Sequence, residues 1–139
     1  MKTTLKTILL ALPLFAAGNA FSADLTIAID DVKDGGGNLM VAVYAKADTF
    51  LKQALASAKA PAKAGSNSLT IKDLAPGEYA FAVYHDLNSN GKLDKNMFGM
   101  PTEDYAFSNN ALGKMGPPSF DSAKLSVPQA GLSTRVTLR

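Results

Sequence analysis

The sequence predicts an all-β fold: a single antiparallel β-sandwich of about seven strands, with one short helix and a long ordered loop. Two observations lead to this fold class. Apolar and polar residues alternate along several short segments, which is the period of a strand with one buried face. Glycine, proline, asparagine and aspartate separate these segments, and short strands divided by turns are typical of antiparallel sandwiches.

The first 22 of the 139 residues are predicted to be a secretory signal peptide rather than part of the fold. Lys2 and Lys6 give the segment a positive start, and a short apolar stretch over residues 8–17 follows. This stretch is shorter than the roughly 20 apolar residues that a membrane-spanning helix needs, so we expect cleavage and no membrane anchor.

Cleavage after Ser22 or after Ala20 would place small residues at the required positions, whereas cleavage after Ala23 would place Phe21 there. The mature domain is therefore predicted to cover residues 23–139. We expect it to be exported, and either periplasmic or secreted.

The charge and cysteine content exclude some functions and stabilising devices. The chain carries 14 Lys and Arg against 12 Asp and Glu, and loss of Lys2 and Lys6 leaves 12 of each. A neutral domain has no attraction for nucleic acid. Because the chain has no cysteine, it can form neither disulfides nor a lipidated cysteine, so its core or a metal must hold the domain together.

The first half of the domain is predicted to contain a hairpin and a helix. Residues 24–32 alternate as a strand with one buried face, and residues 39–45 are apolar on both faces, as in a central strand. The glycines between them predict that the two strands form a hairpin. Residues 47–58 have helical spacing after Asp48 or Thr49 as a possible N-cap, so we expect a short surface helix.

Two further strands are predicted in the middle of the chain. Residues 57–68 are low in information and could be a flexible connection or a weak edge strand. Residues 68–74 read as a strand, and the Pro-Gly turn after them leads into residues 79–86, whose alternation places Tyr79, Phe81, Val83 and His85 on one face.

Residues 98–120 contain too many prolines and glycines for regular structure. Four aromatic residues at intervals predict a folded loop that is pinned by these side chains: Phe98, Tyr105, Phe107 and Phe120. Two last alternating runs, residues 123–127 and 132–138, are predicted to complete the sandwich.

The segment "LAPGEYAFAVYHDLNSNGKLDKNMFGMPTEDYAFSNNALGKMGPPSF" resembles the core of the exported bacterial family DUF2141. The shared features are a Pro-Gly-Glu-Tyr turn, a strand ending in His-Asp, an Asn-Gly loop, Gly-Met-Pro, Ser-Asn-Asn and Gly-Pro-Pro-Ser-Phe. The resemblance covers essentially the whole mature chain. It implies a prealbumin-like sandwich, similar to the accessory domains of carboxypeptidases and to modules of surface proteins, and it implies no activity.

One position departs from the family pattern. The family usually has Glu-Gly-Tyr where this chain has Glu103, Asp104 and Tyr105. The additional carboxylate of Asp104 could add negative charge near the loop or simply be exposed.

The stretch "DLNSNGKLD" is a candidate calcium loop. Asp86, Asn88, Asn90 and Asp94 occupy positions 1, 3, 5 and 9 of a calcium-loop pattern, with Gly91 at the tight bend and the Lys92 carbonyl at position 7. Met97 stands where an EF-hand has a bidentate glutamate, so a missing ligand would come from Glu103, Asp104 or water. The alternative is that these residues form Asx turns without a metal.

His85 is the only histidine, so the chain cannot supply the several histidines of a typical catalytic zinc site. It could ligate a metal or act as a base beside Asp86. The alternative is a histidine at a strand end that hydrogen-bonds the following loop.

A second candidate site is a recognition face for a sugar or peptide, formed by Tyr105, Phe107, Asn109 and Asn110. The same amides could instead pair with backbone groups of the loop and only shape it.

We therefore predict a non-catalytic exported binding or accessory module with a weak calcium loop, whose partner is an unknown protein, peptide or carbohydrate. Two alternatives remain. One is a metal-dependent hydrolase that uses His85, Asp86, Asp94 and Glu103 around a metal-bound water. The other is a structural subunit that assembles through exposed strand edges.

Overall fold

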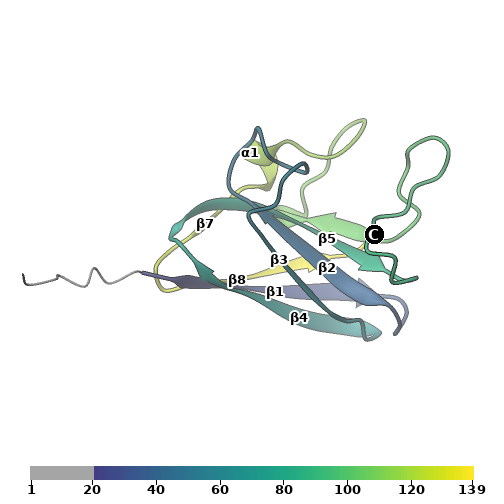
Figure 1. Ribbon diagram of the computed structural model, residues 1–139, viewed down its shortest axis with the longest axis horizontal. Helices are drawn as coiled ribbons and strands as arrows, with labels where there is room; N and C mark the ends of the chain where they lie inside the picture. Colours follow the sequence, from purple (N-terminus) through teal and green to yellow (C-terminus); the bar gives the residue numbers. More distant parts are fainter. Residues whose placement is uncertain (1–20) are drawn as a thin grey trace, which may run out of the picture.

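The computed structural model describes residues 21–139, and it consists of two β-sheets packed face to face (Figure 1). Nearly all of the predicted signal peptide lies outside the described residues. The first strand begins at Ala23, directly after the predicted cleavage position at Ser22. Among residues 21–139, no helix is long and apolar enough to cross a membrane.

Within residues 21–139, eight strands form the two sheets. The first sheet has the order β4-β1-β8, with β1 (Ala23–Val32), β4 (Gly65–Leu74) and β8 (Leu132–Thr137). The second has the order β3-β2-β5-β6, and β7 also pairs with β5; its strands are β2 (Asn38–Tyr44), β3 (Ala56–Pro61), β5 (Gly77–Asp86), β6 (Tyr105–Phe107) and β7 (Leu125–Val127).

The predicted sandwich is confirmed, and its core lies between the sheets. On β1, Leu25, Ile27 and Ile29 are fully buried, as their alternation predicts. On β5, Phe81 and Val83 are buried in the same cluster. Because both sheets direct one apolar face inward, the hydrophobic effect holds the domain without disulfides.

The predicted hairpin between the first two strands is wrong. β1 pairs with β4 and β8, whereas β2 pairs with β3 and β5, so consecutive strands lie in different sheets. The connection from β1 to β2 can pass from one sheet to the other because Gly37 adopts a φ of 62° and packs against the backbone of Asp86. A Cβ atom at Gly37 would clash with the Asp86 carbonyl oxygen, so this crossing requires glycine.

One strand pair departs from the antiparallel arrangement. β1 and β8 run parallel, with Leu25 opposite Leu132 and Asp30 opposite Thr137. The chain ends beside β6, because the backbone groups of Tyr105 and Arg139 exchange two hydrogen bonds of 3.1 and 3.2 Å. The residues after β8 therefore connect the two sheets along one side of the sandwich.

The helix predicted over residues 47–58 is also wrong. Turns occupy residues 47–52, Leu51 has a φ of 59°, and β3 begins at Ala56. Tertiary packing determines the conformation of this segment, because the Phe50 ring is buried against Tyr44, Phe107 and Phe120. The low-information segment after it contains an edge strand, β3, which was one of the two predicted possibilities.

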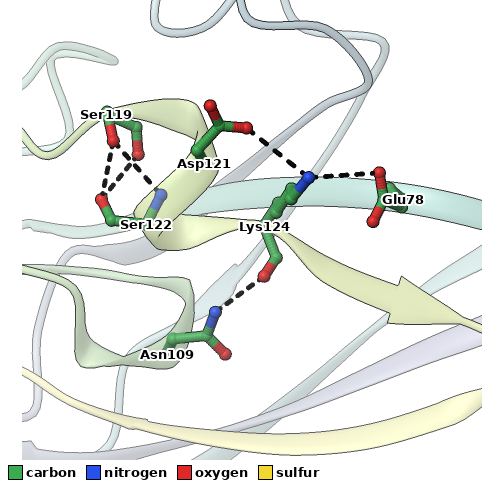
Figure 2. A network of polar contacts seen from close by, with 6 residues as sticks. All are labelled: Glu78, Asn109, Ser119, Asp121, Ser122 and Lys124. Atoms are coloured by element: carbon green, nitrogen blue, oxygen red, sulfur yellow. Dashed lines mark hydrogen bonds and ion pairs between the residues drawn. The ribbon is translucent and has the colours of Figure 1, made fainter.

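The folded loop predicted over residues 98–120 is confirmed, but Phe98, one of the four aromatic residues predicted to pin it, is exposed. It contains β6 and a 3₁₀ turn, η1 (Ser108–Asn110), and it leads into the short helix α1 (Phe120–Ala123). Ser108 is fully buried; its Oγ accepts from the Phe81 N–H at 2.9 Å and donates to the Ala123 carbonyl at 2.5 Å. Figure 2 shows a second link, in which the Asn109 amide donates to the Lys124 carbonyl at 2.8 Å.

Around α1, polar contacts on the surface add to these links (Figure 2). Ser119 caps the helix by accepting the Ser122 N–H at 3.2 Å. The Lys124 ammonium lies 3.5 Å from both Asp121 and Glu78. Because these ion pairs are exposed, they contribute little to stability, and the loop depends mainly on Ser108, which is buried, and on the half-buried rings of Phe107 and Phe120, which pack against Phe50.

Candidate functional site

The candidate loop begins where β5 ends, at Asp86. This carboxylate is only 1% exposed, and it is the last residue of β5, before the loop that rises at the upper right of Figure 1. Its Oδ1 accepts the Asn90 N–H at 3.0 Å, and its Oδ2 accepts the Gly91 N–H at 2.8 Å. Asp86 therefore fixes the first turn of the loop through backbone amides.

The other predicted ligands form a network with Asp94. Its Oδ2 accepts from the Asn88 amide at 2.6 Å, and its two oxygens accept from the Asn90 amide at 2.9 and 3.0 Å. The side-chain oxygens of Asn88 and Asn90 accept the backbone N–H groups of Asn90 and Lys92 at 3.2 and 2.9 Å. The structure brings these residues together, as their spacing predicts. They form Asx turns, in which side-chain oxygens of the loop accept the backbone N–H groups of the same loop.

Glu103 holds both ends of this loop. Its Oε1 accepts the Leu87 N–H and its Oε2 accepts the Asp94 N–H, both at 3.0 Å. The sequence marked Glu103 only as an additional metal ligand or hydrolase carboxylate. Its role in joining positions 87 and 94 is not visible from spacing, because it depends on the chain returning beside its own start.

Tyr84 supports the loop from β5. Its hydroxyl donates to the Gly91 carbonyl at 3.1 Å. The pKa of Tyr84 is raised, first by burial and then by the charges of Asp86 and Glu103, so the phenol remains a neutral donor.

The additional carboxylate of Asp104 forms an ion pair. Its oxygens lie 3.0 and 2.8 Å from the Lys33 ammonium. The hydrogen bond with Asp104 raises the pKa of Lys33. The charge of Asp104 is thus matched by a lysine of the β1–β2 connection.

His85 is separated from these carboxylates. It is 5% exposed, and its Nε2 lies 2.7 Å from the Gly36 carbonyl oxygen. Successive residues of a strand point to opposite faces, so His85 and Asp86 diverge. Among residues 21–139, no three His, Asp or Glu side chains form a group that could hold a metal ion.

The side chains of the predicted recognition face make contacts within the domain itself. Tyr105 and Phe107 are half-buried and pack edge to face at 5.7 Å. The Asn109 amide donates to Lys124, and the Asn110 side-chain oxygen accepts the Thr137 N–H at 2.9 Å. Both asparagines have positive φ, 61° and 50°, which asparagine tolerates better than most residues.

Beyond the carboxylates, the loop ends in an ordered hairpin tip. Lys95 and Pro101 form a β-bridge. The side-chain oxygen of Asn96 accepts the N–H groups of Phe98 and Met100 at 2.9 and 3.1 Å, and the Asn96 N–H donates to the Met100 carbonyl at 2.8 Å.

This ordered tip exposes large apolar side chains. Phe98 was expected to pin the loop, but it is 83% exposed, and its neighbours Met97 and Met100 are 90% and 61% exposed. The loop before α1 similarly exposes Leu112 and Met115, at 64% and 101%. We call these five side chains the apolar tips: Met97, Phe98, Met100, Leu112 and Met115.

A family model described as "Uncharacterized protein conserved in bacteria (DUF2141)" matches residues 27–135, a span that includes the loop and both sheets. No curated protein and no solved structure matches the chain.

Proposed function

Because the chain belongs to DUF2141, a family of uncharacterized bacterial proteins, we propose its function from the candidate site. The protein is an exported, non-catalytic module that binds a partner through its apolar tips. Export rests on the predicted signal peptide, and the periplasm or the cell exterior is the expected location.

The observation that carries this proposal is the exposure of three large apolar side chains on a hydrogen-bonded hairpin tip, Met97, Phe98 and Met100. Exposed apolar patches commonly mark interaction sites, and methionine adapts its shape to different partners. An ordered backbone lowers the conformational entropy lost on binding. The combination supports recognition through these tips.

The acidic residues support a structural role for the base of the loop. Asp86, Asp94 and Glu103 all accept backbone or amide N–H groups, and His85 contacts the Gly36 carbonyl. These contacts favour a structural role, in which the side chains hold the loop, over a role in a hydrolytic active site. Assembly through strand edges has less support, because the edge strand β3 carries Lys59 and ends at Pro61, two residues that discourage edge pairing.

Photo-crosslinking in the bacterium tests the proposal. A photoreactive phenylalanine analogue at position 98 is expected to form an adduct with the partner, because this side chain is exposed on the tip. The matched control carries the analogue at Lys72, an exposed position of β4. Adducts of equal yield from positions 98 and 72 would show that the tips are not the binding surface.

Calcium binding by the base of the same loop is our second proposal. It is favoured by the gathering of Asp86, Asn88, Asn90 and Asp94 in one hydrogen-bonded network. Only two of these side chains are carboxylates, and calcium would have to displace the two amides that donate to Asp94. Both facts favour weak binding, with a dissociation constant of about 10⁻⁴–10⁻³ M.

Calcium at about ten times this dissociation constant is expected to stabilise the domain by roughly 1.4 kcal/mol and to raise Tm by several degrees. Magnesium should raise Tm less, because it releases its waters reluctantly. Asp94→Ala should abolish the shift, whereas Asp48→Ala, at an exposed turn, should retain it. Thermal melts of the wild type and of the two variants, with calcium and with chelator, measure these shifts in Tm. The same shift in wild type and Asp94→Ala would refute calcium binding at this loop.

A further inference from the structure

We propose that the partner of the apolar tips is a membrane surface that contains anionic lipid. This inference rests on the proposed function, since it names the partner of the same tips. It concerns reversible binding at the bilayer surface and requires no membrane-spanning segment.

The first argument is the separation of charges within the two loops. Lys95 directly precedes the first tip, and Lys114 lies between Leu112 and Met115 in the second; both lysines are exposed. No acidic residue occurs between Asp94 and Glu103 or between Asp104 and Asp121. The tips are therefore apolar and basic, which complements a negatively charged surface.

The second argument is the position of the acidic residues. Asp86, Asp94 and Glu103 lie at the base of the first loop, where the carboxylate of each accepts N–H groups. Asp104 is paired with Lys33. The carboxylates of the first loop therefore lie at its base, and none lies within residues 95–102 or 105–120, the segments that carry the apolar tips.

The third argument is the combination of side chains. Phenylalanine, leucine and methionine can enter the boundary between headgroups and acyl chains, while lysine keeps its ammonium group among the headgroups. Binding strength at such a boundary increases with buried apolar area and with attraction to anionic lipids. The tips supply both contributions within short segments.

The shape of the site favours a deformable partner. Figure 1 shows both tip loops on the upper side of the sandwich, away from the sheet of β4, β1 and β8. Met115, Met97 and Phe98 are 101%, 90% and 83% exposed, as expected of side chains on convex tips. A rigid protein partner would need a matching pocket for each tip, whereas a bilayer adapts to both.

Co-sedimentation with vesicles tests this inference on the protein purified after export. We expect binding to vesicles of phosphatidylcholine with phosphatidylglycerol, and much weaker binding to phosphatidylcholine alone. Lys95→Ala should weaken binding about five-fold, as loss of one lysine near an anionic surface predicts. Lys72→Ala, on the outer face of the opposite sheet, should have no effect. Higher salt should weaken binding by screening.

Two substitutions of Phe98 test the apolar contribution to vesicle binding. Phe98→Ser should reduce vesicle binding about ten-fold, because it removes an inserting ring, whereas Phe98→Leu should retain most of it. Equal binding to both vesicle types, or no binding to either, would overturn the inference. An adduct with a protein at position 98 without vesicle binding would overturn the membrane partner and leave the proposed function intact.

Discussion

Phe81→Ala is expected to lower the free energy of unfolding by about 3–5 kcal/mol, a large part of the stability of a small domain. Phe81 is fully buried at the centre of β5, which pairs with β2, β6 and β7. Truncation would leave a cavity between the sheets in a cluster that receives side chains from both. Denaturant unfolding measures the loss.

The matched control for this substitution is Phe98→Ala, which removes the same side chain from a position that is 83% exposed. It is expected to change the free energy of unfolding by less than about 0.5 kcal/mol. Similar losses for the two variants would contradict the assignment of Phe81 to the core and of Phe98 to the surface.

Asp86→Ala is expected to cost about 2–4 kcal/mol and to release the first turn of the loop. The substitution leaves the N–H groups of Asn90 and Gly91 without their carboxylate acceptor, and hydrogen bonds to charged groups contribute about 1.5–3 kcal/mol each. The estimate lies below the sum because water can reach the exposed loop.

Two measurements check the Asp86 prediction: denaturant unfolding, and amide hydrogen exchange at Asn90 and Gly91, which should become faster. Asp48→Ala is the control, since this exposed aspartate supports no comparable side-chain network. Unchanged exchange in Asp86→Ala would mean that the carboxylate does not hold the loop.

The strands could be predicted from the sequence because alternation is a local property. The buried faces of β1 and β5 follow directly from Leu25, Ile27, Phe81 and Val83. The pairing of β1 with β8 could not be predicted, because alternation shows which face is buried and does not identify the neighbouring strand.

The error at residues 47–58 has a related cause. Helical spacing in a short alanine-rich segment is a weak preference, which tertiary contacts can override. Phe50 packs in a cluster with Tyr44, Ala80 and Ala123, and β3 gains a full ladder of pairs with β2. These non-local contacts outweigh the local pattern.

The candidate site was predicted in part. The spacing of Asp86, Asn88, Asn90 and Asp94 indicated a compact turn, and the structure brings these side chains together. The function of Glu103 as a link between the two ends of the loop depends on the folded path of the chain.

The apolar tips were missed for a different reason. An aromatic residue in an irregular segment can face the core or the solvent, and the sequence does not distinguish the two for Phe98. The Asn96 side chain closes the turn that directs this ring outward, away from the aromatic cluster around Phe50.

The claim that the loops present the apolar tips to a partner is tested most directly by the photo-crosslinking experiment, with positions 98, 115 and 72 compared in the same bacterial strain. The account predicts adducts with the same partner, lipid or protein, from positions 98 and 115, which lie on separate loops, and none from position 72 on β4. Adducts from position 72 without adducts from positions 98 and 115 would contradict it.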